Sequence, residues 1–492
     1  MSLRVQFTLE KTELLYQQNA YCTVLLKNIG SSQLAVSVPP MDVSNPTVYL
    51  MNVQTGVEDA YQRMPGARKI DPGPGELSPG DDVESGFYLF SIVPELEPGH
   101  YDMRITWAYN NGLAIAESET TRIKVLPTTP KNLQMANAFG GHGDLKYAVW
   151  INLAGDPNEP PNIIRSRFTL KEGGGVSDVI LVASGTVSCK PVLSSPMVGK
   201  VAASQWIAWI DNKELHFTHV DDELGVSEPQ NLPLALDGIE IIPPLYSAEV
   251  EDTRVRPPGG VLLQHSLPEA NQFRLDSVQL APGGAKSLGH LIIPGEKPLW
   301  AMSHVLSSKQ WLVTYLQKQD GGLLLSYSLW PGMHVENIQP VNLALWKSQL
   351  ITASACVDAE DTIHGGILMW KTPNDKPRRL VLETWTFKGE DIATKEHPLE
   401  WRPNQLIKDA RISVSDTGLP AALIADQEGN WFITVNGGEL KPLPPEIQKT
   451  RQAIEIVFMG GIADPLLVCG TVSRGFNILQ LDGSPLPPTV PK

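Results

Sequence analysis

Apolar and polar residues alternate in short runs along almost the whole chain. At the N-terminal end Leu3, Val5, Phe7 and Leu9 alternate with polar residues, which is typical of a strand with one buried face. Later apolar runs are rich in Val, Ile, Leu, Trp and Tyr and are bounded by Gly, Pro, Asn and Asp. Helical periodicity is nearly absent. The pattern predicts an all-β protein.

The clearest break in the pattern is the proline-bearing stretch 126–131, which favours neither helix nor sheet. We therefore expect a linker over 127–131, between a first domain over 1–126 and a second over 132–492. Strand patterns in the first domain cover 3–9, 21–28, 33–38, 47–52, 83–90, 100–109 and 121–125. Short strands at this spacing predict two packed sheets, an immunoglobulin-like β-sandwich.

One detail of the first domain is more specific. The segment Leu96-Glu-Pro-Gly-His-Tyr101 places a turn just before a tyrosine at the start of a strand. This arrangement resembles the tyrosine corner of immunoglobulin-like folds, in which the hydroxyl bonds back to the backbone. The Cys–Trp–Cys pattern of antibody domains is absent from the sequence.

The second domain contains an internal repeat. Its apolar strand patterns are at 147–151, 205–210, 260–263, 310–316, 366–370, 420–425 and 465–469. Another strand precedes each one (133–139, 190–193, 244–248, 298–304, 349–355, 405–414 and 451–459) and a partner follows it (162–170, 213–220, 272–280, 322–329, 378–386, 429–435 and 475–481). A shorter fourth segment ends several units.

This repeat resembles a β-propeller of about seven four-stranded blades, without the Gly-His and Trp-Asp signatures of WD40 proteins. A lone sheet leaves apolar faces exposed, whereas a ring of sheets buries them against each other. Another phasing of 281–297 or of the tail would give six or eight blades. A fourth segment at 486–489 predicts that the ring closes by packing alone, with the sandwich bracing the seam.

Charge and cysteine usage narrow the class of protein. The 492 residues carry a net charge of −15, which repels phosphate backbones, and the basic points at 376–379 and 254–256 are short. The four cysteines lie far apart without zinc spacing, which is typical of buried thiols in a reducing compartment. No signal-peptide pattern and no long apolar run occurs. We expect a cytoplasmic protein that binds neither nucleic acid nor membrane.

Catalytic and metal motifs are absent from the sequence: it contains no Gly-x-Ser-x-Gly and no His-Glu-x-x-His. We therefore assign no catalytic residue, no metal ligand and no cofactor. One weak pattern remains, because the loops between first and second strands lie near a propeller axis. These loops carry Asp144, Asp252, Asp358, Asp361, His364, Asp416 and Asp464. They could bind a divalent cation or a basic partner segment, or they could be ordinary turn residues.

The function that these observations favour is a non-enzymatic protein-interaction or assembly (scaffold) protein. Its partners would be other proteins, up to a larger assembly, docked on the propeller faces and the sandwich. Two alternatives stay open. One is a propeller-based hydrolase or lyase acting on glycans or peptides, and the other is a lectin-like ligand-binding protein for which tryptophans would form a stacking platform.

Overall fold

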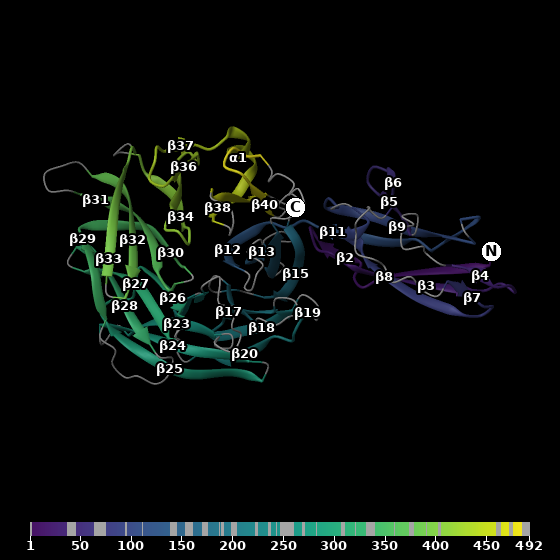
Figure 1. Cartoon of the computed structure of the whole chain (residues 1–492), viewed down its shortest axis with the longest axis horizontal. Coiled ribbons are helices and arrows are strands. Elements are labelled where there is room, and N and C mark those ends of the chain that lie inside the picture. Colours follow the sequence, from purple (N-terminus) through teal and green to yellow (C-terminus); the bar gives the residue numbers. More distant parts are fainter. Residues whose placement is uncertain are drawn as a thin grey trace.

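Short strands form two β-domains in the computed structural model, a sandwich and a ring of sheets (Figure 1). The structure describes the chain except residues 1, 37–45, 63–74, 94–95, 111, 138–144, 153–160, 170–175, 186, 188–190, 198–203, 222–224, 235–237, 243, 247–259, 268–270, 282, 307–309, 320, 331–339, 359, 373–377, 390, 402–404, 459–463, 472–475 and 485–492. The all-β prediction is confirmed. No helix within these described ranges is long and apolar enough to cross a membrane.

The N-terminal domain is a two-layer sandwich. One sheet has the order β1 (Leu3–Leu9), β3 (Tyr21–Asn28), β8 (Asp82–Tyr88). The other has the order β2 (Glu13–Leu15), β11 (Thr121–Leu126), β9 (Gly99–Tyr109), β5 (Thr47–Asn52), β6 (Glu58–Tyr61), with β10 (Ala114–Glu117) also paired to β9. Two short strands, β4 (Leu34–Ala35) and β7 (Glu76–Leu77), pair separately. Alternate residues of β3 and β9 are buried in one shared core, as the period-2 pattern predicts.

The tyrosine corner is confirmed. The hydroxyl of Tyr101, at the start of β9, donates a hydrogen bond of 2.9 Å to the carbonyl oxygen of Glu97. Burial raises the pKa of Tyr101, with a further contribution from the nearby carboxylate of Glu97. The hydroxyl therefore stays protonated and ties the turn to the strand that follows it.

The two domains join with almost no linker. Strand β11 ends at Leu126 and β12 begins at Pro130, so Pro130 and Lys131, expected in the linker, belong to a strand. Between them Thr128 is buried, and the backbone N–H of Thr129 donates to Asn152 Oδ1 at 2.8 Å. The side chain of Asn152 thus replaces a ladder partner where the prolines interrupt the backbone pattern.

Seven sheets form the ring (Figure 1). The first four blades are β12 (Pro130–Asn137), β13 (Leu145–Asn152), β14 (Asn162–Thr169), β15 (Val176–Ser184); β16 (Val192–Met197), β17 (Ser204–Asp211), β18 (Glu214–Asp221), β19 (Gly225–Val226), β20 (Gln230–Pro233); β21 (Glu240–Ile242), β23 (Gly260–Leu267), β24 (Gln272–Ala281), β25 (Gly284–Pro294); and β22 (Pro244–Tyr246), β26 (Trp300–Val305), β27 (Trp311–Gln319), β28 (Gly322–Trp330), β29 (Val341–Trp346).

The remaining three blades follow in chain order. They are β30 (Ser348–Val357), β31 (Ile363–Lys371), β32 (Arg379–Lys388), β33 (Asp391–Leu399); β34 (Ile407–Val414), β35 (Pro420–Asp426), β36 (Trp431–Val435), β37 (Lys441–Pro442); and β38 (Arg451–Val457), β39 (Leu466–Thr471), β40 (Phe476–Leu479). A short helix, α1 (Pro445–Thr450), precedes β38. The sequence analysis missed this helix, although proline favours a first helical position.

Apolar clusters join each blade to the next, from the first to the seventh. The second strand of a blade contributes to the clusters on both of its faces. In β35 every residue is buried, with Ala422 and Ile424 packed toward the fifth blade and Ala421 and Leu423 toward the seventh. The continuous apolar runs of the sequence therefore mark strands covered on both sides, as expected.

One inner strand was assigned wrongly. The sequence analysis placed the inner strand of the third blade at 244–248, but that position is taken by β21, which pairs with β23. Strand β22 instead pairs in parallel with β26 of the fourth blade and contacts β16 and β30. It therefore lies on the axis side of the inner strands. The sequence analysis also missed the outer strands β15, β25, β29 and β33, although β15, β25 and β29 contain apolar runs.

The described residues test one part of the ring-closure expectation, namely that the strand after the sandwich does not pair with the last blade; bracing of the seam by the sandwich stays a prediction. Strand β12 pairs with β13 of its own blade, and the described part of the last blade has the order β38-β39-β40. Strand β40 contacts β15 of the first blade. The expected fourth segment at 486–489 lies outside the described residues.

Replacing Tyr101 by phenylalanine tests the tyrosine corner. Tyr101→Phe should lower the free energy of unfolding of the sandwich by about 1 kcal/mol, the usual contribution of one hydrogen bond. Urea denaturation measures the change. Tyr109→Phe on the same strand is the matched control, since the described residues give its hydroxyl no hydrogen-bond partner; an equal loss in both variants would contradict the assignment.

A buried histidine predicts acid sensitivity of the ring. His304 on β26 is fully buried, neither ring nitrogen has a partner among the described residues, and burial lowers its pKa to about 3. In the unfolded chain the His304 side chain takes up a proton at about pH 6.5, whereas in the folded chain it does so only at about pH 3. The free energy of unfolding should therefore fall as the pH drops from about 6.5 toward 3.

The His304→Leu variant isolates this contribution. Between pH 6 and pH 4 its free energy of unfolding should fall less steeply than that of the wild type, by up to about 1.4 kcal/mol per pH unit. The partly exposed His290 on β25 provides the control variant His290→Leu. Parallel pH profiles for wild type and His304→Leu would refute the prediction.

Candidate functional site: a groove between the fifth and sixth blades

The loop residues singled out in the sequence are only partly brought together. Asp144 and Asp252 lie outside the described residues. Asp358 and Asp361 lie between β30 and β31, and His364 is the second residue of β31. Asp416 lies in the turn between β34 and β35, and Asp464 just before β39. The part of the chain that the structure describes contains no group of three His, Cys, Asp or Glu side chains that could hold a metal ion.

Asp358 holds its own turn together. Its Oδ1 accepts hydrogen bonds of 2.8 Å from the backbone N–H groups of Glu360 and Thr362, and its Oδ2 lies 3.2 Å from His364 Nε2. Partial burial opposes ionisation, but these hydrogen bonds outweigh it and lower the pKa of Asp358. Each carboxylate oxygen thus has a partner inside the protein.

The same end of the fifth blade interlocks with the sixth. Cys356 and His364 are paired across neighbouring strands, and the Cys356 thiol donates to the carbonyl oxygen of Ser415 at 2.8 Å. A Cβ placed on Gly418 would lie 2.9 Å from His364 Nδ1. The structure therefore brings Asp358 and His364 against the turn that carries Asp416.

That turn has the same design as the Asp358 turn. The Ser415 hydroxyl accepts a hydrogen bond of 2.9 Å from the N–H of Leu419, four residues on, just as Asp358 accepts from Thr362. Asp426 accepts from the N–H of Asn430 at 2.8 Å in the same way. Asp and Ser at the first position of such turns replace a missing backbone acceptor. This local role accounts for the presence of Asp358 without a ligand.

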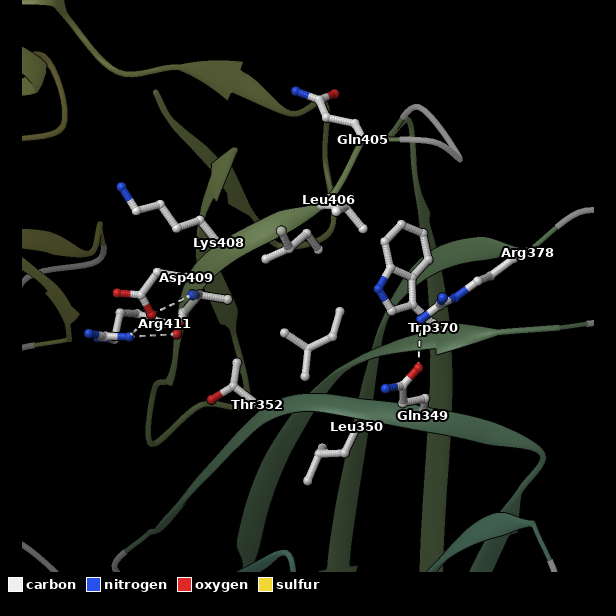
Figure 2. A pocket seen from close by; sticks show the side chains of 13 residues that line it. Gln349, Leu350, Thr352, Trp370, Arg378, Gln405, Leu406, Lys408, Asp409 and Arg411 are labelled. Atoms are coloured by element: carbon white, nitrogen blue, oxygen red, sulfur yellow. Dashed lines mark hydrogen bonds and ion pairs between the residues drawn. The ribbon is translucent and has the colours of Figure 1, made fainter. Parts of the chain in front are cut away.

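A groove of about 600 Å³ lies at the opposite ends of these strands, between the starts of β30 and β34 (Figure 2). Its lining comes from residues 349–352 of the fifth blade, residues 405–411 of the sixth, and Trp370 and Arg378. The volume is within the range of small-ligand and peptide-side-chain pockets.

An arginine stacked on a tryptophan forms one end of the groove (Figure 2). The Arg378 guanidinium carbon lies 4.4 Å from the centre of the Trp370 ring, and its Nη2 donates to Gln349 Oε1 at 2.7 Å. Trp370 is buried, and Arg378 covers one face of its ring. A guanidinium held by stacking and one hydrogen bond keeps further N–H groups for a ligand.

Three charged side chains, Lys408, Asp409 and Arg411, lie at the other end (Figure 2). Arg411 forms an ion pair with Asp409, and its Nε lies 3.6 Å from Glu455 Oε2 of the seventh blade. Lys408 is exposed and has no ion pair within the described residues. This end therefore presents one ammonium group whose charge is not matched by a protein carboxylate.

Apolar side chains fill the middle, and two β-bulges shape it. Leu406 lies between the charged ends (Figure 2) and is 62% exposed, and Ile351 adds an apolar side chain from the fifth blade that packs against the cluster joining the fifth and sixth blades. The strand register shifts between Leu350 and Thr352 in β30 and between Ile407 and Asp409 in β34, which leaves Ile351 and Lys408 without a cross-strand partner. Bulges redirect side chains and often lie at binding sites.

A charged network supports the arginine end from behind. Glu383, on β32, is nearly fully buried; its carboxylate accepts hydrogen bonds of 2.7 Å from Trp346 Nε1 and from Lys371 Nζ. Lys371 also contacts Glu396. Burial disfavours the ammonium form, but the two glutamates outweigh it and raise the pKa of Lys371. The network ties Lys371, the last residue of β31, to Glu383 in the middle of β32 and to Glu396 on β33.

Sequence reasoning missed the groove. It judged the basic segment at 376–379 too short for a binding patch. The one available signal was that Arg378 on the fifth blade and Lys408 and Arg411 on the sixth occupy the same end of consecutive units. Only the packing of those blades turns the three separate cations into one surface.

The interlock of the fifth and sixth blades can be tested at Gly418. Its φ of +80° disfavours any side chain, and a Cβ would press on His364. Gly418→Ala should therefore lower the free energy of unfolding by about 1–3 kcal/mol, of which about 1 kcal/mol comes from the backbone. In a His364→Ala background the loss should shrink toward the backbone share.

Gly389→Ala is the matched control, because Gly389 has a φ of +65° and open space around it. Thermal or urea denaturation of all four variants measures the coupling between positions 364 and 418. Equal costs of Gly418→Ala with and without the His364 ring would show that the contact is not tight.

No family model and no curated protein matches the chain. Among solved structures it is similar to the β-propeller domain of the trilobed protease from Pyrococcus furiosus (14% identity over 73% of this chain and 97% of that chain, TM-score 0.36). It is also similar to BBS1N in its complex with ARL6DN (13%, 72% and 95%, TM-score 0.38) and to the Aleuria aurantia lectin in complex with Fucα1-6GlcNAc (10%, 74% and 99%, TM-score 0.33). At these identities the likeness concerns the propeller architecture alone.

Proposed function

We propose that this protein is a non-enzymatic interaction protein that docks a segment of a partner protein in the groove between the fifth and sixth blades. The observation that carries the proposal is the apolar middle of that groove, formed by the bulged residue Ile351 of β30 and by the exposed Leu406 just before the bulge of β34. A rigid site with a few apolar contacts between polar ends is typical of peptide recognition.

Two features of the groove favour docking over the alternatives. Arg378 covers the face of Trp370, so that ring offers no open platform for stacking a sugar. Among the described lining residues Asp409 supplies the one carboxylate, and it is paired with Arg411, whereas glycoside hydrolysis needs two carboxyl groups facing the scissile bond. A lectin-like or hydrolytic role would therefore need another site.

The wider expectations follow from the same proposal. The end of the sandwich that contains the β9–β10 turn exposes Leu113 and Ile115, which adds a second apolar surface for a larger assembly. Cys22, Cys356 and Cys469 are thiols rather than disulfides, which supports a cytoplasmic location.

Selection from a library of displayed random peptides tests the proposal. Enriched peptides should bind the wild type and the Leu299→Ser variant equally, and bind Leu406→Ser about tenfold or more weakly, since burial of a leucine side chain contributes about 1.5–3 kcal/mol. Leu299 is the control because it is 55% exposed, close to the 62% of Leu406, and lies outside the groove. Failure to enrich any peptide that depends on Leu406, together with binding or cleavage of members of a glycan panel, would overturn the proposal.

A further inference from the structure

The groove is positively charged on a negatively charged protein. The whole chain carries 39 Lys and Arg against 54 Asp and Glu. The groove reverses this balance, because its lining, within the described residues, holds Arg378, Lys408 and Arg411 against the carboxylate of Asp409. A local reversal of charge attracts a ligand of opposite sign that the rest of the surface repels, which directs that ligand to one place.

The charges are arranged at the two ends rather than evenly. Arg378 lies at one end, Lys408 and Arg411 lie at the other, and Leu406 lies between them (Figure 2), with Ile351 of the fifth blade as a second apolar lining residue. A complementary ligand has anionic groups at both ends and an apolar group in its middle.

We infer that the groove binds an acidic peptide segment in which carboxylate side chains flank one or two large apolar residues. This inference rests on the proposed docking function and specifies its ligand. One carboxylate would pair with the guanidinium of Arg378, and the other with the ammonium of Lys408. The apolar residue would pack on Ile351 and Leu406.

Each contact has support in the local structure. Stacking on Trp370 and the hydrogen bond to Gln349 hold the Arg378 plane in place, so little side-chain entropy is lost when a carboxylate binds. Lys408 is the bulged residue of β34, which removes it from the strand register and from the ion pair that occupies Arg411. These two cations, rather than Arg411, are therefore the ones that a ligand engages.

The apolar middle separates this ligand from other polyanions. A sulfated glycan or a nucleic acid would engage the cations, but it would leave the exposed Leu406 in contact with polar or charged groups. The net charge of −15 further disfavours a long polyanion that extends beyond the groove. An acidic peptide with an apolar centre satisfies both parts of the surface.

Fluorescence anisotropy with four labelled peptides tests the inference. The first has Asp and Glu flanking a Leu-Phe centre, the second has Asn and Gln in their place, the third has lysines, and the fourth keeps the acids around a Ser-Ser centre. The first should bind the wild type most tightly, and the other three at least about fivefold more weakly. Its affinity should fall as salt rises from about 50 to 300 mM.

Charge-reversal variants locate the contacts. Arg378→Glu and Lys408→Glu should each weaken binding of the acidic peptide about threefold to tenfold. Each variant should also show a smaller difference in affinity between the acidic peptide and the amide peptide than the wild type does. Lys441→Glu is the control, since Lys441 is an exposed lysine of the same blade outside the groove. Circular dichroism and the melting temperature show that each variant is folded.

The outcomes separate this inference from the proposed function. Equal binding of acidic and amide peptides, with both lost in Leu406→Ser, would overturn the charge assignment while docking in the groove stands. Tighter binding of a sulfated glycan that displaces every peptide would overturn both. Weakening by Lys441→Glu as large as that by Lys408→Glu would show that net charge, and not the groove, governs binding.

Discussion

The apolar contact between neighbouring blades is the interaction on which the rest of this structure depends. A single sheet leaves both of its apolar faces exposed to water. The second strand of each blade is therefore stable only when neighbouring sheets cover it on both sides. Strand β35 is the clearest example, because all of its residues are buried. Alternate residues of this strand pack in the apolar clusters shared with the fifth blade and with the seventh blade. Loss of one blade would expose the faces of two others, which makes the ring one cooperative unit.

The same packing explains why polar chemistry collects at the two ends of the strands. The clusters occupy the middle of each blade interface, and the chain must turn or change direction at its rims. On one rim of the fifth and sixth blades, Asp358 and Ser415 complete tight turns, while Cys356 and His364 press against the neighbouring blade. On the other rim, bulges in β30 and β34 open a groove rather than close a contact. The interface is therefore locked at one end and accessible at the other.

This contrast separates two kinds of charged residue that look alike in a sequence. The carboxylate of Asp358 is held by backbone N–H groups and a histidine, and that of Glu383 by a tryptophan and a lysine, so both maintain the fold. Lys408 has no such protein partner in the described ranges, and Arg378 is positioned by stacking and one hydrogen bond. Groups whose charge the protein does not satisfy are the ones that can act on a partner, and here they lie on either side of the exposed side chain of Leu406.

The sequence by itself determined the all-β class, the tyrosine corner, and the ring with its apolar second strands, because these follow from the local period of side chains and from turn chemistry. It did not determine the crossing of β22 into the fourth blade or the outer strands, whose composition carries no strong period. The sequence also pointed to the acidic turns rather than to the groove, because acidic residues in a turn can be recognised from the sequence, whereas residues that only blade packing brings together cannot. Arg378 and Lys408 lie 30 positions apart in the sequence, and only the packing of the fifth blade on the sixth, with a bulge in each inner strand, places them at the two ends of one surface.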